Sequence, residues 1–151
     1  MTSPATSRRQ ARRDAMVLLY QHDLTGSALE ELYNNLEREE GRVLEPFTRE
    51  VVEAVVVARG EIDAVIDASA ESWPAHRMAA LERNILRLAI YEIKSRNDIP
   101  AEVSINEAVM LAKRFCSHEA GALVNGVLGR IAAECAAGKD AAGKGIAENE
   151  K

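Results

Sequence analysis

Apolar residues recur at helical spacing along nearly the whole chain of 151 residues. In residues 29–36 they fall at i, i+3, i+4 and i+7, which places them on one face of a helix. Similar repeats follow in residues 47–68, 81–96, 104–112 and 119–136, and we find no convincing run of the alternation typical of a strand. Serines followed three positions later by Gln or Glu match the capping box and predict helix starts at Ser7, Ser27 and Ser104.

This pattern predicts an all-α bundle of six to seven helices. A break near Pro74 divides it into two halves of about three helices each, residues 8–70 and 78–136. We expect residues 1–7 to form a flexible N-terminus. The last helix should end near residue 136, and residues 137–151 should form a disordered tail because they lack large apolar residues except Ile146.

The composition is that of an ordinary globular protein, with 47% hydrophobic and 28% charged residues. No apolar run approaches the ~20 residues of a membrane span, and the N-terminus lacks the apolar segment of a secretory signal. We therefore expect a cytoplasmic protein that does not contact membranes. The net charge of −5 argues weakly against a nucleic-acid partner. However, residues 1–20 carry +3, which leaves −8 on the remainder and indicates one localised anion-binding surface.

That surface is an arginine cluster near the N-terminus. At 100° per residue, the four arginines span about 140° on one side of the first helix, and Tyr20 lies on the same side further along. One interpretation is binding of nucleic-acid phosphates by guanidinium groups, with an aromatic ring available to stack on a base. The other is a solvated face paired with acidic side chains of the body. The cluster comprises Arg8, Arg9, Arg12 and Arg13.

Other candidate chemistry is weak. No motif of a nucleophile elbow, zinc protease, P-loop or dinucleotide site occurs in the sequence. Cys116 and His118 are close enough in sequence to consider a nucleophile with its base, but a turn between helices explains them as well. Two cysteines and three scattered histidines match neither a disulfide framework nor a metal site. We expect no catalytic residues, no metal and no cofactor.

Four segments, in order over residues 8–134, resemble the NusB family of bacterial transcription antitermination factors: RRQARRDAMVLLYQHDL, LERNILRLAIYEI, IPAEVSINEAVMLAKRF and LVNGVLGRI. The resemblance implies an all-helical fold of two small bundles. It also implies binding to the boxA element of ribosomal RNA transcripts together with NusE, a ribosomal protein of the small subunit. The complex would join other Nus factors on RNA polymerase and suppress termination.

The resemblance also implies which residues bind. It assigns the arginine-rich motif and Tyr20 to RNA, together with the region before VNGVL, from Glu119 to Asn125. A surface for NusE is expected on the helix that carries Glu82, Tyr91 and Glu92, because acidic and tyrosine side chains suit a basic ribosomal protein.

A related domain precedes the catalytic part of some ribosomal RNA cytosine methyltransferases. This chain leaves no room for that part, so we expect the stand-alone, non-catalytic factor. The alternative is a helical module that binds only protein, or that forms a homodimer with its arginine side buried in the interface.

Overall fold

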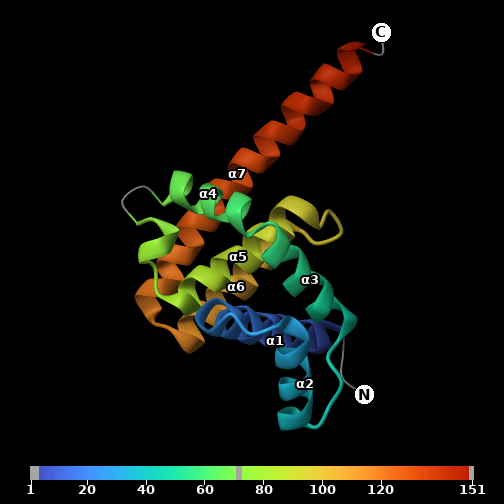
Figure 1. Ribbon diagram of the computed structural model, residues 1–151. Helices are drawn as coiled ribbons and strands as arrows, with labels where there is room; N and C mark the ends of the chain where they lie inside the picture. The colour runs from blue at the N-terminus through green and yellow to red at the C-terminus, as the bar shows by residue number, and fades with distance from the viewer. Residues whose placement is uncertain (1–3, 71–72, 150–151) are drawn as a thin grey trace.

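The computed structural model describes residues 4–70 and 73–149, and side-chain burial for residues 7–70 and 73–138. Within these ranges the chain is helical, with no strand, which confirms the predicted all-α fold (Figure 1). None of the helices described there is long and apolar enough to cross a membrane. The helices are α1 (Pro4–Thr25), α2 (Leu29–Glu40), α3 (Pro46–Val57), α4 (Arg59–Ser69), the 3-10 helix η1 (Ala75–Arg77), α5 (Ala80–Ser95), α6 (Ala101–Phe115) and α7 (His118–Asn149).

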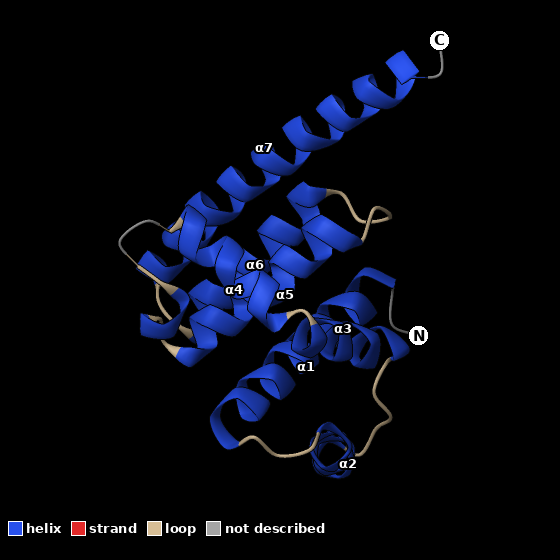
Figure 2. Cartoon of the chain, turned by 45° about the horizontal axis from the view of Figure 1, so that its top comes forward, coloured by secondary structure: helices blue, strands red, loops and turns tan. Residues whose placement is uncertain are grey.

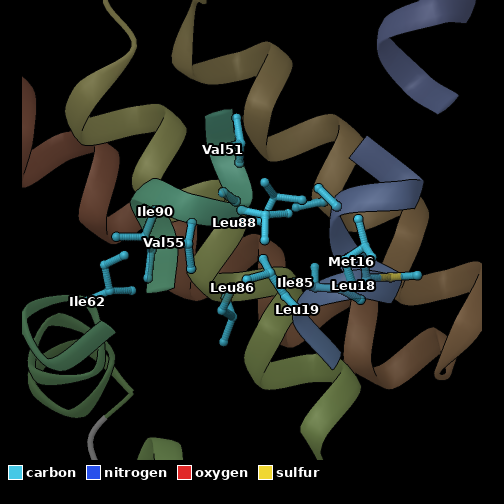
Figure 3. Close-up of a cluster of buried hydrophobic side chains, with 14 of the residues drawn as sticks. Met16, Leu18, Leu19, Val51, Val55, Ile62, Ile85, Leu86, Leu88 and Ile90 are labelled. Atoms are coloured by element: carbon cyan, nitrogen blue, oxygen red, sulfur yellow. The ribbon is translucent and has the colours of Figure 1, made fainter. Parts of the chain in front are cut away.

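Helix α5 is the centre of the molecule and packs against α1, α3, α4, α6 and α7 (Figure 2). It buries almost every residue from Asn84 to Ile93, because neighbours cover it on several sides. Figure 3 shows its apolar side chains meeting those of α1, α3 and α4, including Met16, Val55 and Ile62. Both predicted halves contribute to this single cluster of buried residues, so the division into halves stays a prediction.

The predicted capping boxes are wrong. Ser7 lies inside α1, which begins at Pro4, and Ser104 lies inside α6. At α2 the N-cap residue is Ala28 rather than Ser27, and it makes no side-chain hydrogen bond. A proline stands at the start of two of these helices instead, because Pro4 is the first residue of α1 and Pro100 is the N-cap of α6. Proline suits the first turn of a helix, whose backbone N–H groups have no partner within the helix. Helical structure therefore reaches into the segment 1–7 that we expected to be flexible, of which residues 1–3 lie outside the described ranges.

The continuous helix predicted over residues 47–68 is divided in two. Helix α3 ends at Val57, and α4 begins at Arg59 after Ala58, whose φ and ψ are −91° and 8°. Gly60 stands beside this break and lowers the helix propensity there. The break redirects the chain, because α3 packs against α1 and α5 whereas α4 packs against α5 and α7.

Helix α7 continues to Asn149, beyond the end that we predicted near residue 136. Among the residues of α7 whose burial is described, 118–138, the buried ones lie from Ala120 to Ile131. The rest of the helix rises away from the other helices in Figures 1 and 2. The segment expected to be a disordered tail is thus helical as far as Asn149, and alanine, the residue with the highest helix propensity, is frequent in it.

Candidate nucleic-acid interface

The arginine cluster of α1 faces two different neighbours. The guanidinium carbon of Arg8 lies 4.0 Å from the centroid of the Phe47 ring on α3, and that of Arg12 lies 5.7 Å from the same ring. Arg9 and Arg13 instead face α6. At 100° per residue, Arg12 lies between Arg8 and Arg9 around the helix. It therefore contacts Phe47 on one side and lines a hollow with Arg9 and Arg13 on the other.

Arg12 is part of the interior. Only 4% of the residue is exposed, and its guanidinium donates to both carboxylate oxygens of Glu92 at 2.7–3.1 Å. The Ser104 hydroxyl donates to the same carboxylate at 3.3 Å, so one buried network ties α1 to α5 and α6. These contacts leave little of either side chain exposed, which makes Glu92 a poor candidate for contact with a protein partner. Arg12 still borders the hollow between α1 and α6, so its contact with RNA stays a prediction.

A basic groove lies between α1 and α6. Its volume is about 530 Å³. Five cationic side chains line it together with the carboxylate of Glu107: Arg9, Arg12 and Arg13 from α1 and Lys113 and Arg114 from α6. Apolar side chains add to its lining: Met110, Leu111 and Phe115.

The aromatic ring of the groove stands beside two guanidinium groups. The guanidinium carbon of Arg13 lies 5.8 Å from the Phe115 ring centroid, and that of Arg114 lies 5.3 Å away. This combination of cations and an aromatic ring suits an anionic ligand with flat groups.

A second hollow adjoins the basic groove at Arg9, Glu107 and Met110, which line both. It has a volume of about 440 Å³, and Asn106 and Asn125 supply amide groups to it. Arg9 and Asn125, predicted as site residues from opposite ends of the sequence, thus line one continuous surface. The amides can donate and accept hydrogen bonds beside the cations of the groove.

Tyr20 and Glu119, like Arg8, lie outside these hollows. Tyr20 is half-buried, and its position seven residues after Arg13 keeps it on the same side of α1, about 10 Å further along the axis. Glu119 is exposed in the first turn of α7. Two residues later, Gly121 packs against Lys113 so closely that an added Cβ would lie 2.5 Å from the Lys113 Cγ. The start of α7 therefore supports the lysine that faces the groove.

Sequence reasoning missed the contribution of α6. We assigned no role to Lys113, Arg114 and Phe115, although they form the AKRF end of one recognised segment. The available signal was the pair of adjacent cations in the last turn of α6. Cations are favoured at helix C-termini by the helix dipole alone, so this signal does not distinguish a ligand site from a stable helix end.

The residues predicted for a protein partner do not form one surface. Glu82 and Tyr91 are both half-buried, and nine residues of helix place them about 180° apart around α5.

Burial and the negative charge of Glu82 raise the pKa of the Cys116 thiol. A raised thiol pKa disfavours the thiolate, which is the reactive form, so Cys116 lacks the activation that a nucleophile with His118 would need. Among the described residues, no group of three or more His, Cys, Asp or Glu is arranged to hold a metal ion.

Fold and groove together define a class of small all-α proteins with a localised basic surface suited to an anionic ligand. The NusB family matches residues 9–133. The chain belongs to this family.

Relatives and solved structures agree with that assignment. The transcription antitermination protein NusB of Rubrobacter xylanophilus is 48% identical over 81% of this chain and 87% of its own. The transcription antitermination protein NusB of Myxococcus xanthus is 43% identical over 83% of this chain and 94% of its own. The structure of T. maritima NusB matches with a TM-score of 0.77, 33% identity and coverage of 89% and 94%. A crystal structure of antitermination factors NusB and NusE in complex with dsRNA matches with a TM-score of 0.74, 30% identity and coverage of 85% and 97%.

Proposed function

We propose that this chain is a non-catalytic, RNA-binding transcription antitermination factor. It binds the boxA element of ribosomal RNA transcripts together with NusE and acts in the cytoplasm with other Nus factors and RNA polymerase. Family membership supports this proposal, as does the related structure in which NusB and NusE are in complex with dsRNA. The observation that carries it for this chain is the basic groove, where Arg9 and Arg13 face Lys113 and Arg114.

Each part of the groove has a chemical role in this proposal. Guanidinium and ammonium groups bind phosphate oxygens, and the Phe115 ring and Asn125 amide contact bases. Arg8, Tyr20 and Glu119 flank the path of the strand. The buried pair Arg12 and Glu92 holds α1 against α5, and Arg12 borders the groove from below its exposed cations. For NusE we retain Glu82 and Tyr91 as candidate contacts on α5.

The test is a fluorescence anisotropy titration of labelled boxA RNA with the full chain. The variant Arg9→Ala/Arg13→Ala should bind roughly a hundredfold more weakly, because each lost charged hydrogen bond contributes about 1.5–3 kcal/mol. Its slope of log affinity against log salt should fall by about 1.4, or about 0.7 for each lost phosphate contact to a single strand.

The matched control removes two arginines elsewhere. Arg38 and Arg77 are exposed and line neither hollow, so Arg38→Ala/Arg77→Ala makes the same change in net charge. This control should keep nearly the affinity of the parent. If both double variants lose affinity equally, overall charge rather than the basic groove binds RNA. Addition of NusE should tighten binding of the parent, and NusE without effect would contradict the joint recognition of boxA.

A further inference from the structure

Glu107 is the one acidic side chain among the described residues that line the basic groove and the adjoining hollow. Its Oε1 lies 3.1 Å from the Nε of Arg9. The two partners differ in exposure, because 14% of the Glu107 side chain is exposed compared with 59% of the Arg9 side chain. The carboxylate is thus largely enclosed, while the arginine it holds reaches into solvent.

The position of this ion pair matters for any strand in the groove. Arg9, Glu107 and Met110 are the residues common to both hollows, so a strand that runs from Arg13 to Asn125 passes over the pair. A phosphate that approaches Arg9 competes with the carboxylate for the same guanidinium and is repelled by its charge. A base can instead donate hydrogen bonds from its N–H groups, and a carboxylate accepts such bonds.

We propose that Glu107 is a specificity-determining residue of this groove. Its carboxylate forms an ion pair with Arg9 and repels ligands that offer only phosphate groups. An RNA strand offsets this repulsion, because its bases donate hydrogen bonds to the carboxylate. This inference rests on the proposed RNA binding and adds selection against bare polyanions. The acidic residue therefore lowers binding to phosphate chains more than it lowers binding to the cognate RNA.

The test compares two probes, boxA RNA and an inorganic polyphosphate of similar charge, on the full chain. Glu107→Gln keeps the size and an acceptor oxygen but removes the charge. It should bind polyphosphate roughly fivefold more tightly, a gain that corresponds to the upper value for an exposed ion pair. Its affinity for boxA RNA should rise less or fall, so the ratio of the two affinities decreases. The salt slope for polyphosphate should steepen, because one more phosphate is bound.

Two further variants separate this role from plain charge. Glu102 is exposed on the same helix and lies five residues before Glu107, about 140° away around the axis. Glu102→Gln should leave the ratio of affinities unchanged, and Glu107→Asp, which retains the charge, should stay closer to the parent than Glu107→Gln. Unchanged far-UV circular dichroism and Tm would show that the variants are folded.

Three outcomes would overturn the inference: an equal gain for both probes, equal effects of Glu107→Gln and Glu102→Gln, or no change with either probe. Failure of the proposed function looks different. In that case the parent itself does not bind boxA RNA, and the inference falls with it. If the parent binds boxA RNA and Arg9→Ala/Arg13→Ala weakens that binding, the proposed function stands. The ratio of affinities for boxA RNA and polyphosphate then tests the role of Glu107 alone.

Discussion

Arg12 and Arg13 are neighbours in the sequence and opposites in environment. Both line the basic groove, but Arg12 is buried with Glu92 and Ser104, whereas Arg13 is half-buried near the Phe115 ring. A buried guanidinium is stable only when a carboxylate and hydrogen bonds compensate its lost hydration. Within the described residues, no buried side-chain nitrogen or oxygen lacks a hydrogen-bond partner, so the network around Glu92 is complete.

This burial predicts a large effect on stability. Arg12→Ala should lower the free energy of unfolding by about 3–5 kcal/mol, because Glu92 would remain buried without its counter-ion. Urea denaturation followed by far-UV circular dichroism measures the change. Arg38→Ala, at an exposed arginine, serves as the control and should stay within about 0.5 kcal/mol of the parent, as is usual for surface substitutions.

A double variant checks the cause. In Arg12→Met/Glu92→Leu both charges are replaced by apolar side chains, and such replacements are often neutral or stabilising in other proteins. We expect it to recover most of the stability lost in Arg12→Ala. A double variant as unstable as Arg12→Ala would show that packing around the side chain of Arg12, rather than the unpaired carboxylate, sets the cost.

Sequence reasoning located the arginine cluster, but it could not separate Arg12 from Arg13. Helical spacing fixes the side of α1 on which a residue lies, and both arginines lie on the polar side in that calculation. Which arginine is buried depends on Glu92, which is 80 residues away in sequence. No local pattern carries that information.

Among the elements, α1 and α5 are joined by a second polar network, centred on Asp23. Its Oδ2 accepts hydrogen bonds from Arg83 at 2.7 Å and from Asn84 and Arg87 at 3.0 Å. Arg87 also donates to both oxygens of Asp63 on α4, at 2.7 and 2.8 Å. Burial alone would raise the pKa of Asp23, but these donors and their positive charges outweigh it and lower the pKa below its usual 3.8.

The lowered pKa predicts how acid affects the fold. Because the carboxyl has a lower pKa in the folded than in the unfolded chain, its ionised form stabilises the fold. This contribution is fully present above the unfolded value near 3.8 and is lost as the pH falls through the lower folded value. Asp23→Asn should therefore differ most from the parent near neutral pH and least in strong acid, when urea denaturation is repeated along a pH series.

The control for this experiment is Glu39→Gln, an exposed carboxylate on α2. Its free energy of unfolding should follow that of the parent at each pH. A constant difference between Asp23→Asn and the parent over the acid range would mean that the substitution acts through packing and not through ionisation.

The elements themselves were largely predictable, and their ends were not. Apolar periodicity located the helices because each buries one stripe of side chains. The helix starts failed because the capping motif of Ser104 is a local pattern, while its hydroxyl bonds to Glu92 on another helix. The break at Ala58 failed for the same reason, since it follows from α3 and α4 packing against different neighbours.

At the scale of the whole molecule, charge is unevenly distributed. The chain carries −5 in total, yet the basic groove combines five cations with one carboxylate. The length and net charge could not reveal this, because Lys113 and Arg114 lie about 100 residues from the arginines of α1. A basic groove on an acidic protein attracts RNA locally while the remaining surface repels it, which limits indiscriminate binding.

The same distribution bears on self-association through this groove. A two-fold symmetric dimer places each surface against its own copy. In such a dimer Arg9, Arg13, Lys113 and Arg114 of one copy would face the same four side chains of the other copy. The repulsion between these positive charges disfavours the contact at low salt. We therefore expect the groove to remain open in the free protein at low salt.

Sedimentation velocity over a range of concentrations tests this expectation at low and high salt. The chain should sediment at low salt as a monomer of 16.5 kDa or as an oligomer that still takes up one boxA RNA per chain. Screening would favour a dimer formed through the groove at high salt, and RNA would dissociate such a dimer. One result would contradict the open groove: at low salt the parent forms a stable dimer that does not bind RNA, whereas the Met110→Lys variant does bind RNA. Met110 is 46% exposed and lines both hollows, so an added cation there would break a symmetric contact while it aids binding of a polyanion.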